Sequence, residues 1–395
     1  QLIFDLVKTW GEHRVIYGLE YQDRDFKNRQ VRLSDDLNDD ASNWVFSNIG
    51  ALIPKANAKI YTAYAQDTFA LGDSTQMRLG LRYDDYQYDA ESDANYLDGT
   101  GTLGEISFDA ISWTIGIEQA LSEHLGLEAG VSTGFRAPTI EEMYSTNGST
   151  DDWNTVANPD LESETSTNVD VALVGEYELG RFRLGVFYSQ YDDFIDYETV
   201  EGININTGLP DPNGFNRPVN SGEVKMKGVE LSASLDLSAV LGMEEGLRTT
   251  LMGAYTKGEH DNDDPVYSVQ PPSATWMFNY DNPNGKWGLE FATIYTQGKS
   301  RDASYETNSS GQRVYPMFRS KTATVMDLRA YVDLMQDLRL IVGVYNLMDK
   351  NYYHWDSVRF IDQGDLRPGI GVENNGIRRY SETGRNFKVS LNYQF

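Results

Sequence analysis

The octapeptide MRLGLRYD, residues 77–84, carries apolar side chains at Met77, Leu79, Leu81 and Tyr83, with polar or small residues between them. Successive residues of a β-strand point to opposite faces of the sheet, so this segment has one apolar and one polar face. The same alternation recurs in HRVIYGLEY (13–21), LGLEAGVS (125–132), FRLGVFY (182–188) and LRLIVGV (338–344). Each of these strands is suited to separate an apolar medium from a polar one.

This alternation continues along the whole chain and predicts about 15 strands, with boundaries uncertain by about 2–4 residues. The expected strands are 2–9, 13–24, 58–70, 76–89, 107–120, 124–134, 164–178, 181–197, 223–237, 247–259, 272–281, 286–298, 323–335, 337–347 and 385–394. Their connections alternate between short turns, such as Gly11-Glu12, and long polar segments, such as 135–163. Outer-membrane barrels place short turns in the periplasm and long loops outside. The sequence therefore predicts an all-β fold, an antiparallel transmembrane β-barrel, occupying residues 1–395 as one domain. A β-propeller is disfavoured because no repeat of four-stranded blades is visible.

Composition supports this fold and excludes several functions. Aromatic residues are abundant, with 25 Tyr, 16 Phe and 7 Trp. A transmembrane helix is not expected, since no run of 18 apolar residues occurs. The net charge of −27 argues against nucleic-acid binding, which needs a basic surface. The absence of cysteine removes disulfides and thiolate-bound zinc.

The strand count suggests that part of the barrel precedes residue 1. Closed bacterial barrels have an even number of antiparallel strands, and about 15 is odd. In a 22-stranded transporter these would be strands 8 to 22. We therefore expect that the first strands, and any plug domain before them, are absent from this sequence.

The last residues alternate in the same way and end on an aromatic. A closing strand with a terminal Phe resembles the assembly signal that barrel-insertion machinery recognises, and this resemblance implies a role in assembly. The apolar residues of the segment are Phe387, Val389, Leu391, Tyr393 and Phe395.

Four motifs in order resemble those of TonB-dependent outer-membrane receptors. The first resembles the family's FRAP box, and the second its NP-L box, which is followed by Glu164-Thr165-Ser166. The third is Lys227-Gly228-Val229-Glu230-Leu231, and the fourth resembles the near-terminal NL-D--Y box. The residues that match the first, second and fourth boxes are Phe135, Arg136, Ala137, Pro138, Asn158, Pro159, Leu161, Asn346, Leu347, Asp349 and Tyr352.

The resemblance implies a receptor for active nutrient uptake, not an enzyme. Its partners would be the TonB–ExbB–ExbD complex, acting through a plug and TonB box absent here, the barrel-assembly machinery, and outer-membrane lipid and lipopolysaccharide. The FRAP and NPDL pairing, with Trp355-Asp356-Ser357-Val358-Arg359, is similar to haem and haemoglobin receptors. No intrinsic cofactor is expected, and haem would be a transported ligand. A ferric siderophore is the alternative ligand, and a passive porin is a less favoured function.

The haem hypothesis leaves the iron ligand open. That subfamily often uses a His between the FRAP and NP-L boxes, and this sequence has none between Pro138 and Asn158. Tyr144 lies in that loop, and a Tyr phenolate can ligate haem iron; alternatively it belongs to the aromatic girdle at the membrane boundary. His260 and His354 lie in long loops, where each is either a ligand or a solvated histidine.

Metal and catalytic sites are not predicted. Acidic clusters such as Asp261 to Asp264 do not match a calcium-loop spacing, and we assign them to solvated loops. A hydrolase needs a nucleophile, a base and an orienting group together. Neither His260 nor His354 lies beside a recognisable serine motif.

Overall fold

A computed structural model describes residues 1–28, 30–34, 45–91, 96, 103–146, 155–200, 215–244, 246–307, 313–316, 318–359, 361 and 376–394. It confirms the all-β prediction. One 15-stranded sheet contains strands that lie in chain order, and the strands skipped in this order form three separate two-stranded hairpins. The strands of this sheet are β1 (Leu2–Trp10), β2 (His13–Phe26), β5 (Lys55–Ala70), β6 (Thr75–Glu91), β7 (Glu105–Ala120), β8 (Leu125–Arg136), β9 (Glu164–Tyr177), β10 (Gly180–Asp192), β13 (Val224–Asp236), β14 (Leu247–His260), β15 (Ser273–Asp281), β16 (Trp287–Thr296), β19 (Ala323–Met335), β20 (Leu338–Tyr345) and β21 (Asn386–Tyr393).

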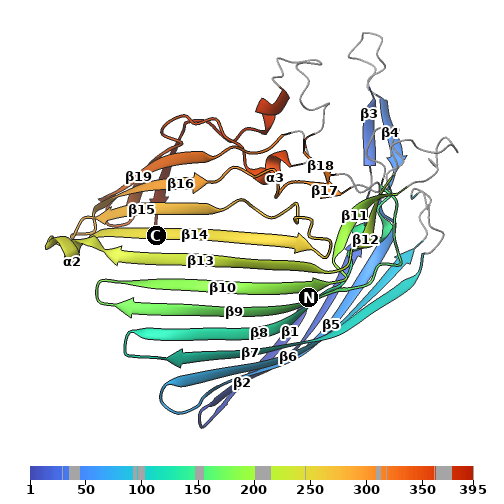
Figure 1. Ribbon diagram of the computed structural model, residues 1–395, viewed down its shortest axis with the longest axis horizontal. Helices are drawn as coiled ribbons and strands as arrows, with labels where there is room; N and C mark the ends of the chain where they lie inside the picture. Colours follow the sequence, from blue (N-terminus) through green and yellow to red (C-terminus); the bar gives the residue numbers. More distant parts are fainter. Residues whose placement is uncertain are drawn as a thin grey trace. The chain divides into compact units, whose positions relative to one another are not determined.

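Adjacent strands pair antiparallel over long, regular registers. Strands β5 and β6 pair from Lys55↔Glu91 to Ala70↔Gln76, and Figure 1 shows successive strands lying side by side. The β19–β20 pair contains a bulge between Asp333 and Met335. Gly11 and Gly72 adopt φ of 54° and 73° at two short turns, a left-handed conformation that glycine adopts without a steric penalty.

The two faces of the sheet differ as the alternation predicts. In β6, Leu79, Leu81 and Tyr83 are 41%, 57% and 42% exposed, whereas Asp84 is 6% exposed. Asp84 accepts hydrogen bonds from Thr62 Oγ1 at 2.6 Å and from Arg82 Nε at 2.7 Å. Large apolar side chains that stay exposed along a sheet suit contact with lipid. Within the described residues, no helix is long and apolar enough to span a bilayer.

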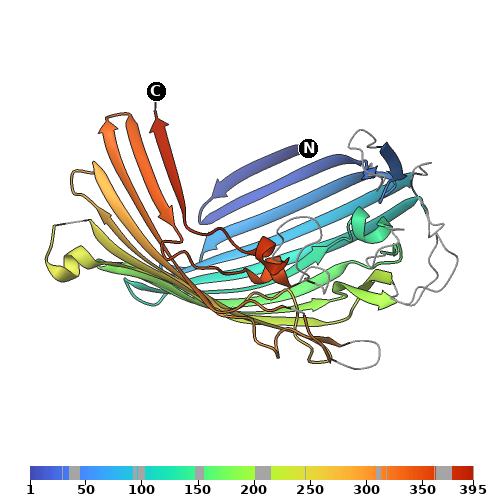
Figure 2. The ribbon, with the colours of Figure 1, turned by 90° about the horizontal axis from the view of Figure 1, so that it is seen from above.

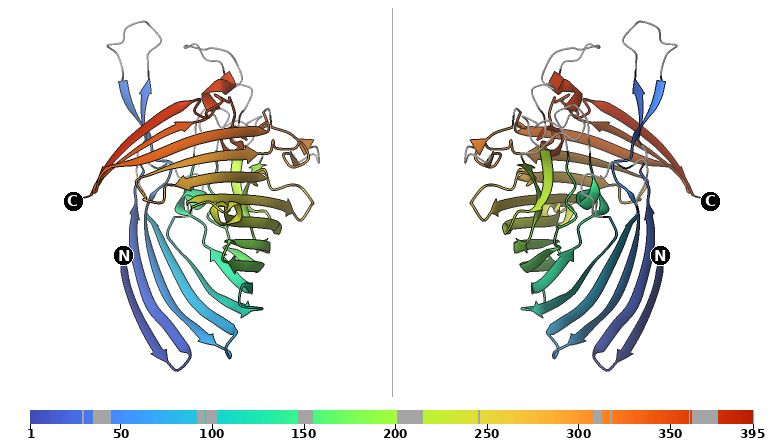
Figure 3. Two further views of the ribbon diagram at one scale, coloured as in Figure 1. Left: turned by 90° about the vertical axis from the view of Figure 1, so that its left-hand side faces the viewer. Right: turned by 90° about the vertical axis from the view of Figure 1, so that its right-hand side faces the viewer.

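The chain divides into two compact units. The first comprises residues 1–117, 130–168 and 190–223, and the second comprises 118–129, 169–189 and 224–395. In the first unit, three elements lie wholly or partly in segments expected to be loops: the hairpin β3 (Gln30–Ser34) with β4 (Val45–Gly50), helix α1 (Ile140–Tyr144), and the hairpin β11 (Ile195–Val200) with β12 (Phe215–Asn220). The predicted strand 181–197 is wrong at its end, because β10 stops at Asp192, Asp193 adopts a positive φ of 55°, and β11 begins at Ile195. Figure 3 shows the β3–β4 hairpin extending past the ends of β2 and β5.

The second unit also has structure in its connections. Helix α2 (Leu237–Leu241) lies in the short connection between β13 and β14, where Asp236 accepts from the Ser238 amide at 2.9 Å. The hairpin β17 (Glu306–Thr307) with β18 (Arg313–Val314) lies between β16 and β19. Helix α3 (Trp355–Val358) and the 3-10 helix η1 (Gly376–Tyr380) lie between β20 and β21, and Figure 2 shows them in red.

Candidate ligand-binding loops

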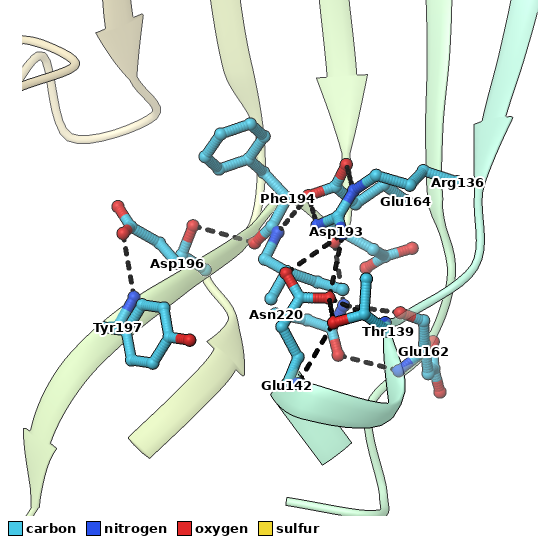
Figure 4. A network of polar contacts seen from close by, with 12 residues as sticks. Arg136, Thr139, Glu142, Glu162, Glu164, Asp193, Phe194, Asp196, Tyr197 and Asn220 are labelled. Atoms are coloured by element: carbon cyan, nitrogen blue, oxygen red, sulfur yellow. Dashed lines mark hydrogen bonds and ion pairs between the residues drawn. The ribbon is translucent and has the colours of Figure 1, made fainter. Parts of the chain in front are cut away.

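Arg136 joins three segments of the first unit at the end of β8. Its Nε and Nη2 donate to the two oxygens of Glu164 at 2.6 Å each, and its Nη1 donates to Glu142 at 2.9 and 3.0 Å (Figure 4). Glu164 begins β9, and Glu142 lies in α1. The side chain of Glu164 is only 9% exposed, so the bidentate pair compensates the charge of a mostly buried carboxylate. This arrangement gives the FRAP-box arginine a structural role.

Helix α1 begins at a capping box built from the same residues. The Thr139 hydroxyl accepts from the Glu142 amide at 3.1 Å, and the Thr139 amide donates to Glu142 Oε2 at 2.8 Å. A capping box satisfies two amides that a helix start leaves unpaired. Glu142 therefore both caps the helix and binds Arg136, which fixes α1 against the strand ends.

The second predicted box anchors the β11–β12 hairpin. Asn158 Nδ2 donates to Pro218 O at 2.8 Å, and Arg217 Nη2 donates to Asn158 Oδ1 at 3.1 Å. Asn220 continues the contact: its Oδ1 accepts from the Glu162 amide at 2.9 Å, and its Nδ2 donates to Glu162 O at 3.0 Å. The Ile195 amide donates to Glu164 Oε1 at 2.8 Å, so the hairpin also reaches the Arg136 network. Pro159 is half-buried beside Asn158.

Tyr144 ends α1 inside an apolar cluster. It is 0% exposed, and its carbonyl accepts a hydrogen bond from Tyr96 Oη at 2.8 Å. The cluster also contains Met143, Ala137 and Leu161, and Phe135 packs against it. Pro138 is fully buried as well. The expectation that Tyr144 occupies an exposed aromatic girdle is therefore wrong. Its role as an iron ligand stays a prediction, and the burial favours packing.

The fourth predicted box forms a tight turn after β20 in the second unit. Asn346 and Asp349 adopt φ of 51° and 52°, a left-handed conformation that Asn and Asp tolerate better than most residues. Asn346 Nδ2 donates to Lys350 O at 2.8 Å, and its Oδ1 accepts from the Lys350 amide at 2.7 Å. Asp349 Oδ1 accepts from the Arg385 amide at 2.8 Å, which ties the turn to the segment before β21.

Three further motif positions have defined surroundings. The Leu347 amide donates to Met326 O at 2.7 Å. Tyr352 is half-buried, and burial together with the Glu382 and Asp327 carboxylates raises the pKa of its phenol. In the third box, a Cβ added at Gly228 would lie 2.5 Å from the backbone oxygen of Tyr255 and from a ring atom of Phe187, so a larger residue would force a backbone shift.

Three loops of the second unit meet at Trp355. Its Nε1 donates to Tyr267 O at 2.8 Å, and Tyr267 Oη donates to Arg359 O at 2.5 Å. Lys299 comes from a third loop, lies 5.1 Å over the Trp355 ring and donates to Val269 O. Trp355 is 1% exposed, so these loops share one small core. Burial, and secondarily the charge of Arg359, lowers the pKa of Lys299 to about 8. Sequence analysis did not single out Lys299 or Tyr267.

The two candidate histidines differ in exposure. His354 is exposed as the residue before α3, with its ring 5.4 Å from that of Tyr352. His260 is half-buried at the end of β14, where its amide donates to Asp264 O at 2.8 Å. His354 is thus open to solvent, while the backbone of His260 belongs to a tight turn. Among the residues that the structure describes, no group of three or more His, Cys, Asp or Glu side chains is placed to hold a metal.

The predicted assembly segment forms the last strand. Strand β21 pairs with β20 from Leu338↔Tyr393 to Tyr345↔Asn386. Its alternate apolar side chains are highly exposed, from 61% to 70%: Phe387, Val389, Leu391 and Tyr393. Phe395 lies outside the described residues. Recognition of this strand by assembly machinery stays a prediction.

An antiparallel sheet with an exposed apolar face, short turns at one end and long loops at the other defines an outer-membrane β-barrel protein. Residues 1–347 match the family described as "TonB dependent receptor-like, beta-barrel", and the chain belongs to this family. Barrels of this family lie in the outer membrane, and its members are receptors and transporters, not enzymes.

Relatives and solved structures agree with this family. The chain is 29% identical over 364 residues to the Hemoglobin-haptoglobin utilization protein B of Neisseria meningitidis, covering 86% of this chain and 44% of that protein. It is 30% identical over 300 residues to the Hemoglobin-haptoglobin-binding protein A of Haemophilus influenzae, covering 73% and 28%. The chain therefore spans less than half the length of these relatives.

The fold is shared with more distant transporters. The Copper transporter OprC superposes with a TM-score of 0.73 at 18% identity, covering 99% of this chain and 56% of OprC. The FrpB iron transporter from Neisseria meningitidis superposes with a TM-score of 0.67 at 16% identity, covering 100% and 54%. At such identities the likeness establishes the fold.

Proposed function

We propose that this chain supplies barrel wall and outer loops to a TonB-dependent receptor that takes up iron from haem or a haem-protein. The observation that carries this proposal is the similarity to the Hemoglobin-haptoglobin utilization protein B, which extends over 86% of this chain, and to the Hemoglobin-haptoglobin-binding protein A, which extends over 73%. The motifs that resemble haem receptors support the same ligand.

The loops have the properties that such a function needs. Specific binding sites are favoured by loops held in one conformation, because less conformational entropy is lost when the ligand binds. Arg136 fixes α1 and β9 in the first unit, and the Trp355 cluster joins three loops in the second. Exposed side chains on these supports, such as His354, would then meet the external ligand.

The test is growth of an iron-starved, siderophore-deficient strain whose only haem receptor is the full-length parent protein. Growth on haemoglobin that is lost when TonB is deleted is the expected result. Growth restored by a ferric siderophore but not by haem would favour the alternative ligand. Uptake that persists without TonB would instead indicate a passive channel.

Hemin titration of the purified full-length receptor in detergent gives a direct measure. A saturable shift of the haem Soret band is expected. His354→Ala and His260→Ala are compared with the wild type, because these are the candidate histidine ligands. Absence of specific hemin and haemoglobin binding would contradict the haem proposal and leave the family assignment intact.

A further inference from the structure

Two tyrosines and two arginines interleave in the loop between β16 and β19. The Arg301 guanidinium carbon lies 3.7 Å from the ring centroid of Tyr315, and that of Arg313 lies 4.3 Å from the ring centroid of Tyr305. The two tyrosine rings meet edge to face with centroids 5.8 Å apart. We call these four residues the Tyr–Arg cluster. None of them belongs to the family motifs or to the candidate ligands predicted from sequence.

The two tyrosines experience opposite environments. Hydrogen bonds from Arg301 and Arg313 lower the pKa of the Tyr315 phenol below its usual value. Tyr305 is 6% exposed, and burial raises the pKa of its phenol. Groups of one kind that neighbouring environments push apart in this way often divide chemical roles. Tyr315 is the more exposed of the two, so its oxygen is the one that an external ligand can reach.

Hydrogen bonds between the two ends of this loop, and burial of Lys299 and Ser304, hold the part of the loop below the cluster in place. The two ends are joined where the Lys299 amide donates to Ser320 O at 3.1 Å and the Gly298 amide donates to Thr322 Oγ1 at 3.0 Å. The buried Lys299 side chain holds one end against Trp355. Ser304 is 0% exposed, and its hydroxyl donates to Ser300 O at 2.8 Å. Arg301, Arg313 and Tyr315 remain open to solvent, fully or in part.

The chemistry of the cluster fits ferric haem. Phenolate is a known axial ligand of haem iron, and a nearby guanidinium stabilises the ionised oxygen that the iron needs. Guanidinium groups also bind carboxylates in a bidentate geometry, and haem carries two propionate carboxylates. The cluster thus offers an iron ligand and two positively charged groups that can bind the propionates. It does so in a chain whose net charge is −27.

We propose that Tyr315 ligates the ferric iron of haem through its phenolic oxygen, and that Arg301 and Arg313 hold this oxygen and the propionate groups. This site rests on the proposed haem function and names the residues that would carry it. It differs from the histidine candidates by the oxygen ligand that it supplies.

The test is hemin binding by the full-length receptor in detergent, followed by the Soret shift and by resonance Raman bands of an iron–phenolate bond. Tyr315→Phe keeps the ring that Arg301 stacks on and removes only the ligand oxygen. We expect it to lose the iron–phenolate bands and to weaken hemin binding at least tenfold. Tyr305→Phe is the matched control, and it is expected to keep both signals. Arg301→Gln is expected to weaken the bands.

Hemin binding by the wild type with unchanged bands and affinity in Tyr315→Phe would overturn this site alone. Loss of the haem spectrum in His354→Ala but not in Tyr315→Phe would assign the iron to the histidine and likewise overturn it. A wild-type receptor that binds neither hemin nor haemoglobin would overturn the proposed haem function, and the site with it.

Discussion

Replacing Arg136 by Ala is expected to loosen the α1 and β11–β12 region while the barrel stays folded. The substitution removes four charge-assisted hydrogen bonds to Glu142 and Glu164. It also leaves Glu164, 9% exposed, with the Ile195 amide as its main partner. Breaking a buried ion pair costs about 3–5 kcal/mol. Because the Arg136 side chain is 40% exposed, solvent screening reduces this cost, and we expect about 2–3 kcal/mol.

Hydrogen–deuterium exchange at Ile195 reports this change directly, because its amide donates to Glu164 Oε1. A loss of about 2–3 kcal/mol corresponds to roughly 30- to 150-fold faster exchange, at tenfold per 1.4 kcal/mol. Arg136→Lys keeps the charge but cannot form the bidentate pair, so an intermediate increase is expected. Arg339→Ala is the matched control, since it removes a surface pair with Asp333 and should not affect Ile195. Exchange at Ile195 within twofold of the wild type in Arg136→Ala would refute the reasoning.

Three further predictions concern single buried or strained side chains. Asn346→Ala should lower the free energy of unfolding by about 3 kcal/mol, because it removes the side-chain hydrogen bonds to Lys350 and leaves an alanine at a positive φ. Urea unfolding of the reconstituted barrel measures this change. Asn346→Gly should recover about 1 kcal/mol of this loss. Tyr144→Phe should leave hemin affinity unchanged in a titration because the side chain is 0% exposed, and a tenfold loss would contradict a packing role. For Lys299, the pKa is about 8 in the folded loops and about 10.4 in an unfolded chain, so loop stability should rise as pH increases from 8 to 10. The rate of trypsin cleavage after Arg359 reports loop opening when it is divided by the rate for an unfolded peptide at the same pH. In the wild type this ratio should fall as pH increases from 8 to 10. It should show no such dependence in Lys299→Met.

The strands were predictable because their determinants are local. Period-2 alternation in a segment such as 77–84 fixes which side chains share a face, and the short turns then fix the pairing of neighbours. The predicted strand 164–178 appears as β9 (Glu164–Tyr177), one residue shorter. Helix α1 also has a local signal, since Thr139 and Glu142 have the spacing of a capping box, although this segment is expected above to be a loop.

The loop contacts could not be predicted in the same way. Trp355 and Tyr267 are separated by 88 positions, and nothing near either residue specifies the other. The hairpin β17–β18 contains two residues in each strand, too few for any alternation to show. Lys299 in sequence is an ordinary loop lysine, and its lowered pKa arises only from burial against the other loops. Contacts between distant loops depend on tertiary packing that local patterns do not encode.

The motif residues use their polar groups within the chain. Arg136 is occupied by two carboxylates, Asn158 by the β12 backbone, and Asn346 by the turn that it begins. Side chains committed to such bonds are poor ligands for a passing molecule, because binding it would leave their present partners unsatisfied. The motifs therefore fix the loop bases, whereas ligand choice falls to exposed residues between them. For this reason Tyr315 and His354, not the motif positions, are the residues to test for haem.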